Sequence, residues 1–277
     1  MHVVETLGVS ARRACRVVGL SRSVLKYKTI GPARDKPLVD AMCLLATQNP
    51  DWGYKKIWRL LKGQGFVVNK KRVLRLWQQE GLQVRRKPAK PRKAGRQDNS
   101  CHIRKAEMLN QVWSVDFVED QTMDGGKLKI LTVLDDFSRE ALAVEVERRM
   151  DNTGVRKTLK RLIAQRGAPE FIRSDNGSEF IAEALRKGLE ELGVETAQIA
   201  PGCPWQNGRN ERLNGILRWE LLDRQVFGSL LEARVMHDRW RQRYNELRPH
   251  SAIGWMTPSQ AAAKASSQGL VWSSPKV

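Results

Sequence analysis

The stretch VWSVDFVEDQTMDGGKLKILTVLDDFSREALAVEVE, residues 112–147, decides the fold class of this chain. It contains three runs rich in β-branched and other aliphatic residues, at 112–118, 127–137 and 140–147. Such runs are typical of strands, and the sequence Asp124-Gly125-Gly126 between the first two is a turn signal. Because the connections are short, the sequence predicts three strands of an antiparallel meander.

Helical and strand patterns alternate after this stretch. A helix is expected at 153–165, a fourth strand at 170–175 and a second helix at 180–193. A short fifth strand at 195–200 and a third helix from about 207 to 222 complete the series. The order β-β-β-α-β-α-β-α predicts an α/β fold with one mixed five-stranded sheet flanked by helices.

The charge of the chain is unevenly distributed. The 277 residues carry a formal net charge of +19. Residues 1–105 hold 25 Lys and Arg against six Asp and Glu, whereas residues 106–277 hold 24 of each. This segregation indicates a polyanion-binding arm joined to a neutral domain, and a merely solvated basic surface is the alternative. An anionic membrane would also attract the arm, but no amphipathic anchor accompanies it, which favours nucleic acid.

The sequence contains no apolar segment long enough for a membrane span or a signal peptide, so we expect the protein in the cytosol. The four cysteines form no C-x-x-C pair, which predicts neither a disulfide framework nor a zinc site. These cysteines are Cys15, Cys43, Cys101 and Cys203.

The basic arm is expected to be mostly helical. Residues 10–28 predict two short helices with N-caps at Ser10 and Ser21, giving a helix-turn-helix-like segment over residues 1–30. The stretch GPARDKP, residues 31–37, predicts a link. Three further helical patterns predict a basic helical DNA-binding domain over 36–82.

Within that domain, the pattern after the N-cap candidate Asn69 predicts a buried stripe of Val73, Leu74 and Trp77. The cations on the polar sides of its helices are expected to bind DNA. They are Lys55, Lys56, Lys70, Lys71, Arg72 and Arg75. Residues 83–105 hold nine Lys and Arg and two Pro, which predicts a basic linker that follows a phosphate backbone.

Two carboxylates of the neutral part stand out. Asp175 follows the fourth predicted strand directly before the turn signal Asn176-Gly177. It is either a turn-capping side chain or a metal-binding carboxylate at a sheet edge. Asp116 lies among apolar residues of the first strand, where a charge is costly unless something cationic holds it.

A third carboxylate lies on the last predicted helix. Glu211 falls on a polar stripe together with Asn207, Asn214 and Arg218, whereas the apolar residues of this helix lie mostly on another arc. Taken alone, Glu211 is a solvated surface side chain. Trp219 and Trp240 are more simply core residues than platforms for base stacking.

Five segments carry a family resemblance. They are WSVDF, LTVLDDFSRE, IRSDNGSEF, PGCPWQNGRNERLNGILRWELL and YNELRPHSAIGWMTPSQA. In this order and spacing they resemble the OrfB-type DDE transposases of two-reading-frame bacterial insertion sequences, whose catalytic core is retroviral-integrase-like. The resemblance implies a ribonuclease-H-like core at 106–225, followed by a C-terminal helical extension and tail at 226–277.

The resemblance also implies a catalytic, metal-binding triad of Asp116, Asp175 and Glu211, with Asp116 bridging two Mg²⁺ ions. Mn²⁺ is a possible substitute for Mg²⁺. Asp135 and Asp136 match the family pattern as well, and we interpret them as a structural turn. Two departures flank the helical glutamate, because Asn210 and Arg212 replace the usual aliphatic residue and serine. A zinc module like that of retroviral integrases is absent from the sequence.

The activity implied is metal-dependent cleavage at insertion-sequence ends and strand transfer into target DNA, with Asn207 and Arg218 contacting DNA near the cut. The implied partners are the terminal inverted repeats, target DNA, other copies of the chain and possibly an upstream-frame protein. The implied setting is the bacterial cytoplasm, at the nucleoid when the protein is bound. The alternatives are a DNA-binding regulator with an inactive integrase-like core and a nuclease that cuts without joining.

Overall fold

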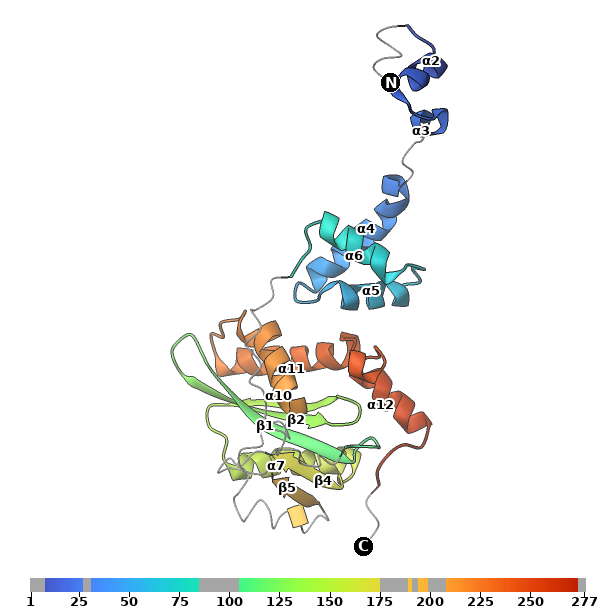
Figure 1. The fold of residues 1–277 in the computed structure, drawn as a ribbon. Helices are drawn as coiled ribbons and strands as arrows, with labels where there is room; N and C mark the ends of the chain where they lie inside the picture. The colour runs from blue at the N-terminus through green and yellow to red at the C-terminus, as the bar shows by residue number, and fades with distance from the viewer. Residues whose placement is uncertain are drawn as a thin grey trace, which may run out of the picture. The chain divides into compact units, whose positions relative to one another are not determined.

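The computed structural model describes residues 8–26, 31–84, 105–174, 189–190, 194–198 and 208–273. The chain divides into two compact units, Met1–Val84 and Arg85–Val277 (Figure 1). Residues 85–104 of the predicted linker and most of the helix predicted at 180–193 lie outside the described residues.

The first unit begins with the two short helices predicted from the sequence, α2 at Ala11–Val18 and α3 at Arg22–Lys26. The Ser10 side chain accepts a hydrogen bond from the Arg13 amide at 3.3 Å, and Ser21 Oγ accepts one from the Val24 amide at 3.4 Å. Both N-cap predictions are therefore confirmed. Gly19 ends α2 in the left-handed conformation, which glycine adopts without steric cost.

The predicted link at residues 31–37 is wrong, because these residues form the first turns of α4, Gly31–Gln48. Asp35 is buried there and makes ion pairs with Arg72 and Arg75 of α6, Lys70–Gln79. The helix holds Asp35 within reach of both arginines. These ion pairs favour helix at a stretch where Pro37 removes one backbone hydrogen bond.

Helices α4 and α6 share an apolar core with α5, Tyr54–Gly63. Asn69 caps α6 as predicted, since its side chain accepts from the Lys71 amide at 2.9 Å. The predicted stripe on α6 is wrong at one position. Leu76 is buried with Val73 and Trp77, whereas Leu74 is only partly buried. The observed set follows the i, i+3, i+4 spacing of one helix face.

A five-stranded mixed sheet forms the centre of the second unit and confirms the predicted architecture (Figure 1). Its strands are β1 Val112–Gln121, β2 Lys127–Asp135, β3 Ala141–Glu147, β4 Phe171–Ser174 and β5 Glu195–Gln198. The order is β3-β2-β1-β4-β5, with antiparallel pairing of β1, β2 and β3 and parallel pairing of β1, β4 and β5.

Two of these strands differ in length from the prediction. β1 continues three residues past Val118 and pairs with β2 as far as Gln121 and Lys127. β2 stops at Asp135, because the Asp135 carboxylate accepts hydrogen bonds from the amides of Phe137 and Ser138 and so turns the chain.

Helices cover both faces of the sheet (Figure 1). Helix α7, Asn152–Arg166, packs Val155, Leu159 and Leu162 against one face. The other face carries α10 at Gly208–Leu217, its π-helical continuation η3 at Arg218–Leu222, and α11 at Leu230–Leu247. The short helix η4 at Ser251–Ile253 and α12 at Pro258–Ser267 follow. Within the described residues, no helix has the length and apolarity needed to cross a membrane.

Two polar residues of the YNELRPHSAIG segment anchor α11 and the chain after it. The Asn245 amide exchanges two hydrogen bonds of 2.9 Å with the backbone of Ala141 in β3. Arg248 forms a buried ion pair with Glu220 of η3. The segment therefore helps to fix the helical layer that carries α10 against the sheet.

Candidate active site

Asp116 lies in the middle of β1 on the face covered by α10. Side chains alternate along a strand, so its neighbours Val115 and Phe117 point to the other face, toward α7. Asp116 is half-buried. Its Oδ1 accepts from the Phe117 amide at 2.9 Å, and its Oδ2 accepts from Asn214 Nδ2 at 2.8 Å. The Asn214 amide of α10 thus contacts the Asp116 carboxylate, which the sequence analysis found among apolar residues.

Two residues of the predicted polar stripe, Asn214 and Arg218, contact β1. Leu213 and Leu217 are buried, while Asn214 reaches Asp116. Arg218, four residues later, donates to the Glu119 carbonyl oxygen at 3.3 Å. Glu211 precedes Asn214 by three residues and is exposed, and residues at this spacing lie on the same side of a helix. Glu211 therefore lies one helical turn from the group that contacts Asp116.

A polar seam, formed by Thr132 of β2 with Asn210 and Asn214 of α10, supports this contact. The Thr132 hydroxyl lies 2.9 Å from Asn214 Oδ1 and 3.2 Å from Asn210 Oδ1. Asn210 is fully buried, and its Nδ2 donates to the Thr132 carbonyl oxygen at 3.3 Å. The sequence analysis noted Asn210 only as a departure from the family. Its spacing of four residues from Asn214 was the available signal for a shared partner.

Asp175 and Asn207 lie outside the described residues. Two of the three predicted carboxylates are thus placed on neighbouring elements, because α10 packs on β1. Among the described residues, no three His, Cys, Asp or Glu side chains gather closely enough to hold a metal ion, and Asp175 is not among them.

Both units are similar in sequence to known proteins. The HTH-like domain family matches residues 34–90, and two integrase core domain families match residues 106–204 and 192–258. The insertion element IS407 uncharacterized 31.7 kDa protein of Burkholderia multivorans is 38% identical over 265 residues, which cover 94% of this chain and 93% of that protein. The transposase InsD of Escherichia coli insertion element IS2 is 28% identical over 80% of this chain and 76% of its own. The chain belongs to the integrase-core transposases of insertion elements.

A solved structure, the simian T-cell lymphotropic virus intasome in complex with PP2A regulatory subunit B56 gamma, aligns with a TM-score of 0.49 and 18% identity. The alignment covers 80% of the transposase and 74% of that chain. The strand order and the integrase-core matches identify the ribonuclease-H-like fold of the transposase.

Asp135, the last residue of β2, and Asp136 build the turn between β2 and β3. Asp135 is buried and accepts hydrogen bonds from the Asn110 amide and from the amide and hydroxyl of Ser138. Burial raises the pKa of Asp135, and these bonds oppose the shift. The Asp136 carboxylate accepts from Ser114, Arg173 and Arg209. Both aspartates therefore serve as hubs of the turn, which agrees with their structural interpretation.

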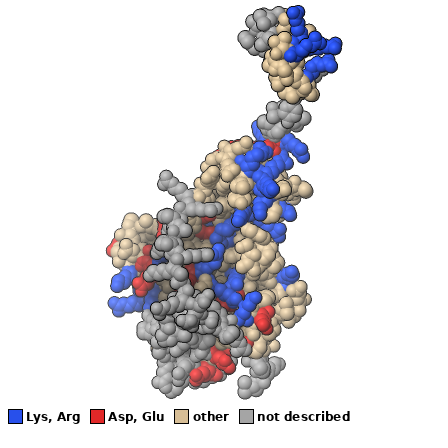
Figure 2. All heavy atoms as spheres, in the orientation of Figure 1, with Lys and Arg blue, Asp and Glu red and all other residues tan. Residues whose placement is uncertain are grey.

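The predicted DNA contacts of the first unit fall into two groups. Lys55, Lys70 and Lys71 are exposed, and Figure 2 shows Lys and Arg gathered over the visible surface of this unit with few acidic atoms among them. Arg72 and Arg75 are instead paired with Asp35. The Lys56 ammonium lies over the Trp52 ring, 5.4 Å from its centroid. The three exposed lysines are the best placed of the six to meet a phosphate backbone.

The two tryptophans of the second unit differ in burial. Trp240 is buried and stacks on Tyr244 with a centroid distance of 5.1 Å, which confirms its core assignment. Trp219 is only partly buried, and the Arg224 guanidinium lies 5.8 Å from its ring centroid.

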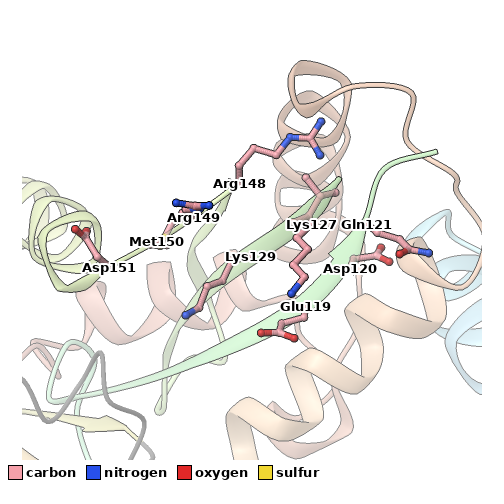
Figure 3. A pocket seen from close by; sticks show the side chains of 10 residues that line it. Glu119, Asp120, Gln121, Lys127, Lys129, Arg148, Arg149, Met150 and Asp151 are labelled. Atoms are coloured by element: carbon pink, nitrogen blue, oxygen red, sulfur yellow. The ribbon is translucent and has the colours of Figure 1, made fainter. Parts of the chain in front are cut away.

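A cavity of about 500 Å³ lies at the other end of β1 and β2 (Figure 3). Arg148, Arg149 and two lysines line it together with the acidic side chains of Glu119 and Asp120, so its charge is mixed. The Arg148 guanidinium donates to the Thr122 hydroxyl at 2.6 Å. Neither Asp116 nor Glu211 lines this cavity, and it is not the candidate active site of the transposase.

Proposed function

We propose that the transposase holds two Mg²⁺ ions, or Mn²⁺ in their place, with Asp116, Asp175 and Glu211. With them it cleaves DNA at the ends of its insertion sequence and joins those ends to target DNA. The observation that carries the proposal is the hydrogen bond from Asn214 to Asp116, because it brings the helical turn after Glu211 against the strand of Asp116.

The register of β1 and β4 supports the inclusion of Asp175. Ser114 pairs with Arg173, and Asp116 and Asp175 each follow two residues later in their own segments. The three side chains offer carboxylate oxygens alone, the hard ligands that Mg²⁺ prefers. Bound at such a site, two ions stabilise charge on the attacking and leaving oxygens of a phosphodiester.

The residues around the carboxylates orient them. Asn214 holds one oxygen of Asp116, and the Thr132 hydroxyl contacts the other end of the same amide. Arg218 is exposed, and its bond to the Glu119 carbonyl oxygen holds its stem along β1. In this proposal Arg218 and Asn207 contact the DNA near the cut.

The first unit recognises the element ends in this proposal. The HTH-like match at 34–90 covers the helices that carry the exposed lysines, and those lysines neutralise backbone phosphates. An insertion sequence has two ends, so we infer that at least two copies of the chain act together on DNA. In this proposal the copies act in the cytoplasm, at the DNA that they cut and join. A protein made from an upstream reading frame is a further partner that the proposal allows.

The test is the replacement Glu211→Gln in the full chain, assayed on DNA that carries the element ends in Mg²⁺. The amide keeps the shape of the side chain but removes its charge, so we expect cleavage to fall at least about a hundredfold. Glu246→Gln on α11 is the matched control, because Glu246 is another exposed helical glutamate.

Circular dichroism and metal-free DNA binding should be unchanged in both variants. Cleavage by the Glu211→Gln protein at the normal rate would remove Glu211 from the triad. A wild-type chain that binds the ends tightly but cuts nothing in Mg²⁺ or Mn²⁺ would instead be a DNA-binding regulator.

A further inference from the structure

A second cavity, of about 320 Å³, lies where the β2–β3 turn and the start of α10 meet η4 and α12. Much of its wall is apolar. The apolar lining residues include Ala106, Phe137, Ile253, Met256, Ala261 and Ala265. Four cations also line it, Lys105, Arg139, Arg209 and Lys264, and Asp136 is the single carboxylate among the described lining residues. The cavity therefore has an excess of positive charge against a largely apolar wall.

The one carboxylate of this cavity is already engaged. Asp136 accepts a hydrogen bond of 2.9 Å from Arg173 and another of 2.9 Å from Arg209. In the described part of the chain, no acceptor contacts the Arg139 guanidinium, although this side chain is half-buried. Burial first and the nearby Arg209 second lower the pKa of Arg139, and the nearby Asp136, Tyr244 and Asp135 oppose this shift. The carboxylates of Asp136 and Asp135 attract this guanidinium, but no acceptor among the described residues contacts it, so a half-buried donor is left for an anion from outside the chain.

The backbone conformation of Arg139 also indicates a functional role for this residue. Its φ is 65°, in the left-handed region that glycine and asparagine adopt more readily than a long side chain does. Arginine thus occupies a position where the local backbone disfavours it. Such an outlier suggests that the side chain has a function of its own.

We propose that this cavity binds a backbone phosphate of the DNA substrate, with Arg139 as the principal ligand and Arg209, Lys105 and Lys264 around it. The inference rests on the proposed function. DNA is favoured over a free anion because Arg209 precedes Glu211 by two residues in the first turn of α10. The two side chains point to different sides of this turn, so a strand at the carboxylates would reach the cavity by passing the N-terminal end of α10.

The guanidinium of arginine suits this role. It presents a planar fork of N–H groups that matches two oxygens of a phosphate. The apolar wall keeps water away from one side, which strengthens the attraction between the charges. The phosphate would supply the acceptor that Arg139 lacks, and it would fix the register of the strand next to the proposed catalytic residues.

The first experiment compares Arg139→Asn with the wild type, as full chains without metal, on DNA that carries an element end. We expect fluorescence anisotropy to show about a tenfold loss of affinity, because one charge-assisted contact is removed. The slope of log K against log salt should become shallower by about 0.9. The melting temperature should stay equal or rise, because asparagine tolerates the left-handed conformation and the repulsion from Arg209 is removed.

The matched control is Arg149→Asn, which removes an exposed arginine at the mixed-charge cavity of Figure 3. Its affinity should stay within about twofold of the wild type. A second measurement replaces single phosphates near the scissile bond by neutral methylphosphonates. One position should weaken binding by the wild type and leave binding by Arg139→Asn unaffected.

Wild-type affinity and salt slope in the Arg139→Asn protein would overturn the proposal. A loss that is the same at every methylphosphonate position would also overturn it, because no single phosphate would then meet Arg139. Inorganic phosphate that stabilises the wild type but not the variant, with DNA affinity unchanged, would indicate a free-anion site instead. Because binding is measured without metal, failure of the triad in the Glu211→Gln assay is distinguishable from failure here.

Discussion

Asn214 of α10 donates a hydrogen bond of 2.8 Å to Oδ2 of Asp116 in β1. The same amide faces the hydroxyl of Thr132 with its oxygen, at 2.9 Å. A carboxylate only accepts hydrogen bonds, so Asp116 takes the amide nitrogen, and the amide oxygen is left to accept from the Thr132 hydroxyl. The orientation of Asp116 therefore depends on a helix and on a neighbouring strand at once.

Replacing Asn214 by Ala should weaken metal binding without unfolding the chain. Asp116 would lose the donor that orients it, and the loss of such a supporting partner typically costs 10–100-fold in metal affinity or activity. We expect the Mg²⁺ concentration for half-maximal cleavage to rise by roughly this factor. Asn152→Ala, at the start of α7, is the control. An unchanged Mg²⁺ titration would show that Asn214 has only a packing role.

Replacing Asn210 by Ala should destabilise the second unit. The change leaves the Thr132 carbonyl oxygen without its amide donor in a fully buried place. The lost buried hydrogen bonds and the space left by the side chain together cost about 1–3 kcal/mol, and urea unfolding of the full chain should show a loss of this size. A change below about 0.5 kcal/mol would mean that water or a rearranged side chain satisfies Thr132.

Asp35→Asn should destabilise α4 and α6. Hydrogen bonds from Arg75 and Arg72 lower the pKa of Asp35, so folding favours the charged carboxylate. That stabilisation is present above the unfolded pKa of about 4 and is lost as the pH falls through the lower folded value. We expect a loss of about 1–2 kcal/mol at pH 7, because both arginines are partly exposed.

Hydrogen exchange of the α4 and α6 amides in the full chain measures this loss. The difference between Asp35→Asn and the wild type should shrink below about pH 4, where the wild-type carboxylate also becomes protonated. A difference that grows as the pH falls would contradict the ion-pair explanation.

Removing residues 1–105 should separate recognition from chemistry. Residues 106–277 hold equal numbers of basic and acidic residues, so the long-range attraction to DNA would be lost. If the full chain neutralises about 6–10 phosphates, its affinity should fall roughly 10³–10⁵-fold between 50 and 200 mM salt. The shortened chain should show a much flatter response and cut weakly without preference for the element ends. Selection of those ends as good as that of the full chain would place recognition in the catalytic unit.

Local patterns determined a large part of this protein. The β-rich runs of residues 112–147, with their glycine-containing turn, are sufficient to predict the meander, because strand preference and turn chemistry act over a few residues. The caps at Ser10 and Asn69 were predictable for the same reason. The uneven charge and the family segments indicated a DNA partner and nominated Asp116 and Glu211.

Contacts between distant residues decided the rest. Asp35 contacts Arg72 at a separation of 37 residues, within a stretch that the local pattern predicted as a link and that is helical in the structure. Asn214 meets Asp116 at a separation of 98, and Asn210 meets Thr132 at 78. The cavity that Arg139 lines exists only in the tertiary structure, where η4 and α12 lie beside the β2–β3 turn. The sequence pattern predicts which face of each helix or strand is buried. It does not predict which residue a buried polar side chain will pair with, because that partner comes from another element and is fixed only when the two elements pack together. The pairing matters because an unpaired buried polar group is costly.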